Sequence, residues 1–503
     1  MKRVSGQFAI YDNTRTTYDS SEPMSEYTIS DILRAETTTV EIDDYGRSGA
    51  GVVVLADGRL YVPGALPGER VTIEPEAEPD DAGRPYARIV DIPNGSPQRR
   101  DPLCDRDEVC RGCHLRHATV TEELDFKVET VRQAVAAHAG LAREDQPDVE
   151  TITPFPTKRG DAYRIRTALT YRIEDGDAEL GLATPVRDRP VPMGDCPALT
   201  GAARRLIGYI ASALDYVSTP PPAYTATEEA ADPPPGIRQI ELATPTYGRG
   251  LVDIEVGGLD GEEAFLEFLD DQPVERFLEA LADRLPEDIG LAINDGETRE
   301  HLEAPRRIRL PLLGLKLVAG FDDWLPPTLD PTEALYEYVL EQLDLETSDR
   351  LLDVGCGIGT LTILASPHIA SATGIDINRH SIEAAELNAV DNDADHVEFV
   401  PSGWEKALRQ LALADRQFDA ATINPARSPL GERPLTYLGK MGIDRLVYIG
   451  PSPESAGRDL GFLRSKGWEI AALGAANVDP AHYRTTLVAR VRRDLPDDHG
   501  NHG

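Results

Sequence analysis

Three of the chain's five cysteines, Cys104, Cys110 and Cys113, lie within the ten-residue segment CDRDEVCRGC. A fourth, Cys196, follows in the segment PVPMGDCPAL. Four thiolates can bind either a zinc ion or an iron–sulfur cluster. Paired CxxC motifs would favour zinc, whereas the five-residue gap after Cys104 and the distant fourth cysteine favour a cluster. We therefore expect a tetrathiolate metal site, with unliganded thiols as the alternative.

The segment RLLDVGCGIGTLTILA has the pattern of a ligand-binding turn between a strand and a helix. A hydrophobic strand is expected at residues 350–354, with Asp353 near its end. Three glycines follow in the turn: Gly355, Gly357 and Gly359. The next strand ends at Asp376, about 20 residues later, where a carboxylate can accept both hydroxyls of a ribose. This combination favours S-adenosylmethionine over a dinucleotide, and a tight turn without any ligand is the alternative.

The segment Asn424-Pro425-Ala426-Arg427 follows the fourth hydrophobic strand of the same region. In doubly wound sheets, ligands bind in the crevice outside the carboxyl ends of the strands. We therefore expect Asn424 to face the methyl donor or the substrate, with plain loop geometry as the alternative. The fifth cysteine, Cys356, lies inside the glycine turn, where a small residue fits.

Helical segments alternate with hydrophobic strands after Pro331. This order predicts an α/β domain at residues 331–493, with a Rossmann-like, doubly wound parallel sheet. The last two strands, WEIAAL and TTLVARV, are expected to form a hairpin at the edge of that sheet. Residues 494–503 are expected to form a disordered tail.

Residues 34–95 contain short alternating strands separated by turns such as ADG and ALPGE. They predict a small, five-stranded, OB-like β-barrel, which would bind RNA or serve only as a docking module. Residues 1–33 have no regular pattern and are expected to form a flexible leader. Residues 96–330 contain four of the cysteines, one helix and several hairpins, and they predict a central α+β domain. The proline-rich segment 218–236 is expected to be an exposed loop.

Acidic residues outnumber basic residues by 87 to 51, which gives a formal net charge of −36. They are spread along the chain, so they indicate a generally acidic surface rather than a site for a basic partner. Only seven of the basic residues are lysine. Dispersed carboxylates with so few lysines are typical of halophilic proteins in a salt-saturated cytoplasm. Because the Debye length is about 3 Å in molar salt, the net charge does not exclude nucleic acid as a partner.

The sequence contains no apolar run of the roughly 18 residues that a membrane span needs. Its N-terminal segment has no signal-peptide core, and five cysteines do not fit a secreted disulfide framework. We expect a cytoplasmic monomer that does not bind membranes.

The segment CDRDEVCRGCHLRHATVTEELDFK, which ends at Lys127, resembles the iron–sulfur signature of the RNA uracil-5-methyltransferases. The upstream segment YGRSGAGVVVLADGRLYVPGALPGERV is similar to the TRAM barrel of that family, and the final third is similar to its methyltransferase domain. The resemblance covers residues 36–493. It implies a structured tRNA or rRNA as substrate, S-adenosylmethionine near Gly355, Asp376 and Asn424, and a [4Fe-4S] cluster on four ligands: Cys104, Cys110, Cys113 and Cys196.

The segment that would contain the family's catalytic nucleophile is different here. In that family a cysteine thiolate adds to C6 of uracil, C5 is methylated, and a glutamate then removes the C5 proton. The family motif YVSCNPAT–RDL corresponds to YIGPSPESAGRDL, in which Arg458-Asp459-Leu460 sets the alignment. The cysteine position then falls on Pro451 or on its neighbour Gly450. Neither residue can form a covalent adduct.

Three further family positions have also changed. Arg484 occupies the position of the glutamate, in the segment DPAHYRTT. Pro326, in WLPPT, replaces a glutamine that helps to bind the donor. The family's DPPR motif becomes Asn424-Pro425-Ala426-Arg427. Together these changes argue against the family's covalent mechanism.

The sequence therefore predicts an S-adenosylmethionine-dependent RNA methyltransferase, of the EC 2.1.1 class, that lacks the family's nucleophile and base. The residues that carry out its catalysis are not identified. One alternative is methylation of a different base atom: an Asn-Pro segment resembles the amino-group methyltransferases, in which an amide and a carbonyl hold an NH2 group, although Arg427 replaces their usual aromatic residue. A second is a catalytically inactive RNA-binding paralogue. A third is an enzyme that binds the donor but acts on something other than RNA.

Overall fold

The computed structural model describes residues 24–493, apart from gaps at 77–78, 80–82, 103, 105–109, 111, 154–161, 185–186, 225–232 and 247. The chain divides into two compact units. The first comprises Met1–Asp101 and His114–Glu122, and the second comprises Pro102–Cys113 and Glu123–Gly503. Residues 1–23 of the expected leader and the whole expected tail, 494–503, lie outside the described residues.

The first unit contains six strands in two antiparallel, three-stranded sheets. One sheet contains β1 (Thr38–Glu41), β5 (Arg70–Pro75) and β6 (Ala87–Asn94), and the other contains β2 (Asp44–Tyr45), β3 (Gly51–Leu55) and β4 (Gly58–Val62). Alternating residues of these strands, such as Val40, Val53, Leu60 and Val71, form one buried core. The expected five-stranded barrel is not confirmed. Residues 42–43 interrupt the first strand and so divide it into β1 and β2, and the described strands, six in all, form two separate sheets.

The expectation of a flexible leader up to residue 33 is wrong for its described part. Residues 24–33 form the 3-10 helix η1 (Met24–Glu26) and the helix α1 (Ile29–Ile32). Thr28 caps α1, because its side chain accepts a hydrogen bond from the backbone N–H of Asp31. Ile32 is fully buried in the core of this unit, which gives the segment a reason to fold.

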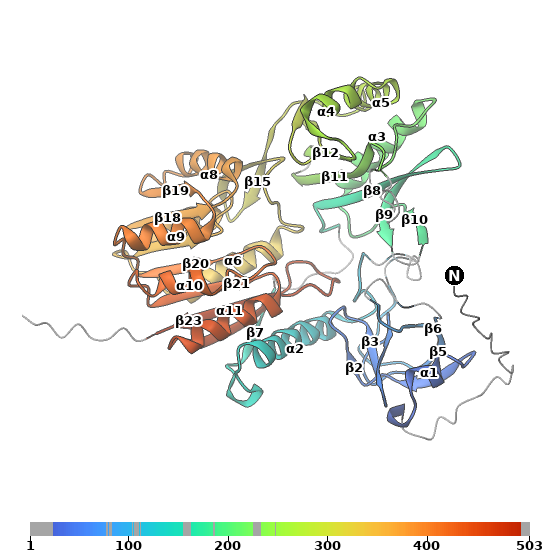
Figure 1. The fold of residues 1–503 in the computed structure, drawn as a ribbon, viewed down its shortest axis with the longest axis horizontal. Coiled ribbons are helices and arrows are strands. Elements are labelled where there is room, and N and C mark those ends of the chain that lie inside the picture. The colour runs from blue at the N-terminus through green and yellow to red at the C-terminus, as the bar shows by residue number, and fades with distance from the viewer. Residues whose placement is uncertain are drawn as a thin grey trace, which may run out of the picture. The chain divides into compact units, whose positions relative to one another are not determined.

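The described part of the second unit contains a seven-stranded, mixed sheet in the order β10-β9-β8-β11-β12-β13-β14. Its strands are β8 (Arg166–Glu174), β9 (Asp177–Thr184), β10 (Arg187–Val191), β11 (Gly236–Thr246), β12 (Arg249–Gly257), β13 (Ile289–Asn294) and β14 (Arg299–Glu303). The helices α3 (Gly201–Tyr216), α4 (Gly261–Leu269) and α5 (Gln272–Ala282) share its hydrophobic core. A hairpin, β15 (Arg307–Leu312) and β16 (Leu315–Gly320), follows it in the chain (Figure 1).

An eight-stranded sheet in the order β19-β18-β17-β20-β21-β23-β22-β7 follows. The strands β17 to β21 are parallel, as expected for a doubly wound sheet. The strands are β7 (Val149–Ile152), β17 (Arg350–Val354), β18 (Ser371–Asp376), β19 (Val397–Pro401), β20 (Ala420–Ile423), β21 (Arg445–Gly450), β22 (Glu469–Ala476) and β23 (Thr486–Arg492).

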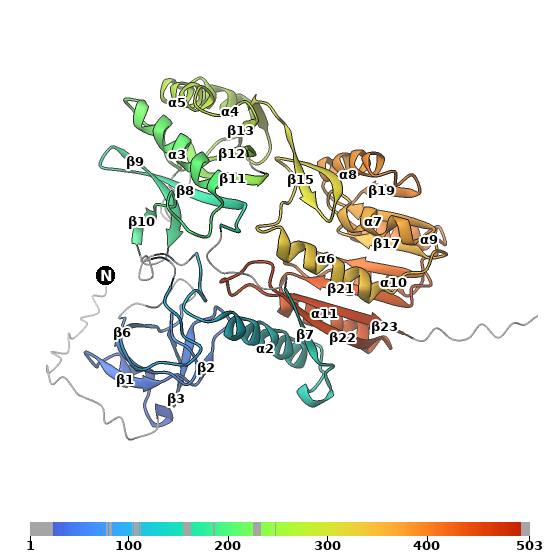
Figure 2. The same cartoon turned by 180° about the vertical axis from the view of Figure 1, so that it is seen from behind.

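Helices cover both faces of this sheet, and each face has its own hydrophobic core (Figures 1 and 2). One face packs against α2 (Val120–His138), α9 (Trp404–Leu413), α10 (Glu432–Leu438) and α11 (Pro453–Ser465). The other packs against α6 (Asp330–Leu343), α7 (Thr360–Ala365) and α8 (Arg379–Asp391). Two filled faces leave only the strand ends accessible to a ligand.

The hairpin of β22 and β23 forms as expected, but it does not lie at the edge of the sheet. The strand β7 pairs in parallel with β22 and becomes the edge strand. Only Ile152 of its four residues is buried, so its sequence carries little strand signal. No helix in the described part of the chain is both long enough and apolar enough to span a membrane.

Candidate active site

The glycine turn after β17 forms the centre of the candidate site. Gly355 has a φ of +83°, and a Cβ atom there would lie 2.2 Å from the carbonyl oxygen of Asn424. Only glycine allows this close approach. Gly357 also has a positive φ, of +53°, but a Cβ atom there would meet no heavy atom within 4 Å. The turn therefore packs against β20 at Gly355 and is open at Gly357.

Asp376 lies at the carboxyl end of β18, directly beside the open part of the turn. Its two carboxylate oxygens accept hydrogen bonds from the backbone N–H of Gly357, at 3.0 Å, and from that of Asn378, at 2.9 Å. Each oxygen keeps a second acceptor position. The next residue, Ile377, is 74% exposed. A carboxylate and an exposed apolar side chain therefore lie next to each other at this edge.

Asp353, which the sequence placed among the cofactor-binding residues, lies beneath the turn rather than at its surface. It is 1% exposed, and burial raises its pKa. Its oxygens accept hydrogen bonds at 2.6 Å from the hydroxyls of Thr362 and Thr422. We infer that Asp353 joins β17 to α7 and β20 and so positions the turn, without touching a ligand.

The segment that begins at Asn424 is fixed at both ends, to the sheet at Asn424 and to α11 at Leu430 and Gly431. The backbone N–H of Asn424 donates to the carbonyl of Val354 at 2.8 Å. The side chain of Asn424 forms no hydrogen bond with the described residues. Asp459 of α11 accepts hydrogen bonds from the backbone N–H of Leu430, at 2.6 Å, and from that of Gly431, at 3.1 Å. The backbone of Asn424 is therefore held in place beside the turn, and its side-chain amide has no hydrogen-bond partner among the described residues.

No thiol lies at the position expected for the family's nucleophile. Pro451 directly follows β21, and a Cβ atom on Gly450 would lie 2.4 Å from the Cβ of Ala456, so a larger residue at position 450 would clash. Cys356 is buried inside the turn, and burial raises the pKa of its thiol well above the usual value. A buried, protonated thiol is a poor nucleophile.

The segment between β22 and β23, which contains Arg484, is held by a buried lysine. Lys127 is fully buried, and its Nζ donates to Asn477 Oδ1 and to the carbonyl of Arg484, both at 2.8 Å. Glu123 Oε1 lies 3.6 Å from the same nitrogen. Burial lowers the pKa of Lys127 to about 7. The side chain of Arg484 is exposed, so the expected base position carries a cation at the surface.

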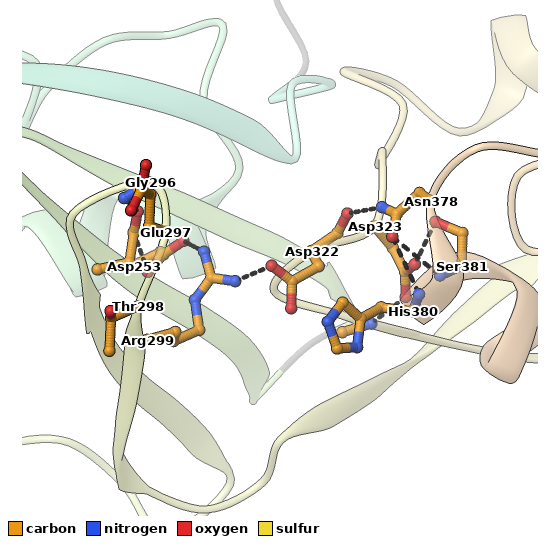
Figure 3. A network of polar contacts seen from close by, with 12 residues as sticks. Asp253, Gly296, Glu297, Thr298, Arg299, Asp322, Asp323, Asn378, His380 and Ser381 are labelled. Carbon is orange, nitrogen blue, oxygen red and sulfur yellow. Dashed lines mark hydrogen bonds and ion pairs between the residues drawn. The ribbon is translucent and has the colours of Figure 1, made fainter. Parts of the chain in front are cut away.

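The loop that contains Pro326 forms hydrogen bonds with the start of α8, which follows Asp376. The sequence did not predict this contact. Figure 3 shows Asn378 donating to the carbonyl of Asp322 at 2.7 Å and Ser381 donating to Asp323 at 2.7 Å. On the other side, Arg299 of β14 forms an ion pair with Asp322. Two aspartates in so acidic a sequence give no signal of this role. Pro326 itself is buried and offers no polar side-chain group.

The four cysteines expected to hold a metal are gathered only in part. The pKa of Cys113 is raised to about 11, mainly by burial; the nearby charge of Arg164 lowers it, and those of Cys196 and Cys110 contribute to the rise. Cys196 accepts hydrogen bonds from the backbone N–H groups of Ala198 and Leu199.

Among the described residues, however, no three His, Cys, Asp or Glu side chains are placed to hold a metal ion. The expected tetrathiolate site on Cys104, Cys110, Cys113 and Cys196 is therefore not confirmed. Thiols repel one another once ionised, so they converge fully only around a compensating cation. Residues 105–109 and 111, which connect the first three cysteines, lie outside the described residues.

Comparisons with known proteins agree with this architecture. The family model described as a methyltransferase domain matches residues 345–441, which include the glycine turn, Asp376 and Asn424. The 23S rRNA (uracil(1939)-C(5))-methyltransferase of Vibrio parahaemolyticus is 23% identical over 89% of this chain and 94% of its own length. An uncharacterized RNA methyltransferase of Clostridium tetani is 24% identical over 87% of this chain and 92% of its own length.

A solved structure has the same fold over nearly the whole chain. It is that of the tRNA (uracil-54, C5)-methyltransferase of Pyrococcus abyssi in complex with S-adenosyl-L-homocysteine. The TM-score is 0.64 at 19% identity, and the match covers 90% of this chain and all of the other. The similarity therefore extends through both units of the chain and is not confined to the methyltransferase domain.

Proposed function

This chain is a homologue of the RNA uracil-C5 methyltransferases, at low sequence identity, and we propose that it transfers a methyl group from S-adenosylmethionine to a structured tRNA or rRNA without the family's cysteine and glutamate. The observation that carries the proposal is the open turn at Gly357 beside the carboxylate of Asp376. Both groups lie at the carboxyl edge of a doubly wound sheet, where such sheets bind ligands.

Three residues would hold the donor at this edge. Asp376 would accept the two ribose hydroxyls through the acceptor positions that its backbone hydrogen bonds leave unused. The exposed side chain of Ile377 would pack against the adenine ring. Gly357 would allow the close approach of the rest of the molecule. The donor supplies a methyl group on a positively charged sulfur, and the protein supplies its position.

The residues that replace the family's nucleophile limit which atom can be methylated. C5 of uracil is a poor nucleophile until a thiolate has added to C6. Neither Pro451 nor Gly450 can add to the base, and Arg484 cannot remove a proton as a glutamate does. We therefore propose a target atom that does not need covalent activation.

An exocyclic amine of a base is the target that the geometry favours. The carbonyl oxygen of Asn424 lies against Gly355, and its side-chain amide forms no hydrogen bond in the described part of the chain. A carbonyl and a side-chain amide oxygen could accept the two hydrogens of an NH2 group, which leaves the nitrogen lone pair directed at the methyl group. After transfer the nitrogen loses one proton to solvent. Replacing Asn424 with alanine should abolish transfer but keep donor binding.

Isothermal titration with S-adenosylmethionine tests donor binding. The wild-type protein should bind the donor, and Asp376→Asn should weaken binding about 10–100-fold, because hydrogen bonds to a charged group contribute about 1.5–3 kcal/mol. Asp391→Asn is the matched control, since Asp391 is exposed at the other end of α8. A wild-type protein without donor binding would contradict the proposal.

A catalytically inactive RNA-binding paralogue is the competing interpretation. Mass spectrometry of the RNA nucleosides from a deletion strain and its parent separates the two. We expect one methylated nucleoside to be missing from the deletion strain. An identical set of nucleosides in both strains would favour the inactive paralogue.

A [4Fe-4S] cluster on Cys104, Cys110, Cys113 and Cys196 remains a separate proposal. The proximity of three of these thiols, and the backbone hydrogen bonds to Cys196, support it. Anaerobically purified protein should contain about four iron and four sulfide ions per chain. One zinc ion per chain without sulfide would contradict the cluster and favour a zinc site.

A further inference from the structure

Three arginines at the amino edge of the eight-stranded sheet are neutralised by carboxylates. Three ion pairs lie there: Arg350 with Asp419, Arg445 with Asp349, and Arg492 with Glu469. Arg445 and Arg492 are opposite each other on β21 and β23, so both are at the same edge. In a chain with 87 acidic residues, paired arginines are the expected state.

Three arginines at the carboxyl edge are different. Arg427, Arg458 and Arg484 are all exposed, and none of them forms an ion pair with a described residue. Two acidic residues, Glu432 and Glu454, lie in the first turns of α10 and α11 at this edge. No ion pair joins either of them to the three arginines in the part of the chain that the structure describes. Free cations at this place are therefore available to an external anion.

The strand register places the three arginines on chain segments that adjoin neighbouring strands. Ile423, the last residue of β20, pairs with Tyr448 of β21. Gly450, the last residue of β21, pairs with Leu487 of β23. Arg427 follows β20 by four residues, Arg458 lies in the helix after β21, and Arg484 lies just before β23. All three chain segments therefore leave the sheet at the edge that holds the glycine turn.

Ser455 of α11 joins two of these arginines. Its hydroxyl donates to the carbonyl of Arg427 at 2.9 Å and accepts a hydrogen bond from the Nη2 of Arg458 at 3.1 Å. The buried Asp459 fixes the same loop through the backbone N–H groups of Leu430 and Gly431. The guanidinium groups are therefore carried by a fixed backbone, which lowers the entropy lost when they bind a ligand.

We propose that Arg427, Arg458 and Arg484 form an anion-binding rim that contacts phosphodiester groups of the RNA substrate beside the donor site. A guanidinium group binds a phosphate through two parallel hydrogen bonds, and its charge is retained at all working pH values. A base that reaches Asn424 would bring its own backbone phosphates to this edge. The inference rests on the proposed function and specifies how the same site holds its RNA.

The test is RNA binding across a salt series, measured by fluorescence anisotropy with a labelled, unmodified tRNA transcript and a labelled 23S rRNA fragment. We expect the same result for each of three single variants: Arg427→Ala, Arg458→Ala and Arg484→Ala. The affinity for whichever RNA probe the wild-type protein binds should fall about 5-fold. The slope of log K against log salt should decrease in magnitude by about 0.7–0.9, which is the value for one lost phosphate contact. Arg484→Lys, which keeps the charge, should restore the slope.

Arg492→Ala is the matched control, because Arg492 ends the strand that Arg484 precedes and lies at the amino edge. It should bind RNA with the wild-type affinity and slope. Titration of S-adenosylmethionine checks that every variant still binds the donor.

Wild-type affinity and slope in all three alanine variants would overturn the rim while leaving the proposed function intact. A wild-type protein that binds neither probe at any salt concentration would overturn both the rim and the RNA substrate. An equal loss of RNA affinity in Arg492→Ala would show that the effect comes from the overall charge of the protein, and it would also overturn the rim.

Discussion

The two edges of the eight-stranded sheet use the same residue types in opposite ways. At the amino edge, Arg350, Arg445 and Arg492 are paired with carboxylates. At the carboxyl edge, Arg427 and Arg484 are exposed and form no ion pair with described residues. These arginines are therefore neutralised at the amino edge and remain exposed, without an ion pair to a described residue, at the carboxyl edge.

Openness and exposure alone do not separate the two edges. Gly467, which turns the chain into β22 at the amino edge, is as open as Gly357, and Leu413 at the end of α9 is as exposed as Ile377. The carboxyl edge differs because Gly357, Ile377 and the carboxylate of Asp376 lie next to one another there. This grouping supports the carboxyl edge as the binding edge.

The largest expected effect concerns the buried anchor of the carboxyl edge. Asp459→Ala would leave the backbone N–H of Leu430 and Gly431 and the hydroxyl of Tyr448 without their partner, and we expect a loss of about 3–5 kcal/mol in the free energy of unfolding. Asp419→Ala, which removes the partly exposed pair with Arg350 and one hydrogen bond to its backbone N–H, should cost only about 1–2 kcal/mol. Urea denaturation measures both, and equal costs would contradict the comparison.

The second prediction concerns the pH dependence of stability. Burial lowers the pKa of Lys127 to about 7 from 10.5. Between these values the unfolded chain binds a proton that the folded chain does not, so the free energy of unfolding should rise with pH across this window by a few kcal/mol. The neutral amine can still donate to Asn477 and to the carbonyl of Arg484.

Lys127→Met should remove this pH-dependent rise, whatever its effect on overall stability. Urea denaturation at several pH values from 7 to 10 measures it. The rise should persist in Lys440→Met, because Lys440 is exposed. An unchanged rise in Lys127→Met would show that another group causes it.

The third prediction separates the two kinds of glycine. Gly357→Ala and Gly467→Ala both place a side chain at a positive φ with no heavy atom within 4 Å, so each should cost about 1–2 kcal/mol of stability. Only Gly357→Ala should also weaken S-adenosylmethionine binding, by about 10-fold or more, because the donor must approach that turn. Thermal unfolding and titration of the donor distinguish the two effects. Equal donor affinities in both variants would contradict a donor site at the Gly357 turn.

The smallest expected effect concerns the exposed isoleucine. Ile377→Ser should weaken donor binding about 5-fold, which is the contribution of a partly buried aliphatic side chain, with little change in stability. Leu413→Ser is the matched control, because Leu413 is 75% exposed at the end of α9 and Ile377 is 74% exposed. Titration of the donor into both variants is the measurement. A loss of affinity in Leu413→Ser as well would point to a general effect on folding.

The carboxyl edge was largely predictable from the sequence because its signals are local. A few neighbouring residues, the glycines after a hydrophobic strand and the acids at strand ends, are enough to predict the backbone geometry of this edge. The roles of individual groups were less predictable. Asp353 is buried, and its carboxylate accepts hydrogen bonds from Thr362 and Thr422, which belong to other elements. The residues next to Asp353 in the sequence do not predict this role.

Features that depend on distant parts of the chain were missed. The strand β7 is four residues long, and it is recognisable only once β22 provides a partner. Asp322 and Asp323 are two acids among 87, and their contacts with Arg299 and Ser381 arise only in the folded chain. The thiols carry a strong sequence pattern, but the described residues contain no metal-binding group, so the metal site stays a prediction.

The most direct test of the central claim is methyl transfer in vitro, with the purified protein, isotope-labelled S-adenosylmethionine and RNA from a deletion strain. Digestion to nucleosides should place the label in an amine-methylated nucleoside and leave 5-methyluridine unlabelled. Label in 5-methyluridine would contradict the account, because it would require an attacking group that the carboxyl edge does not contain in the described residues.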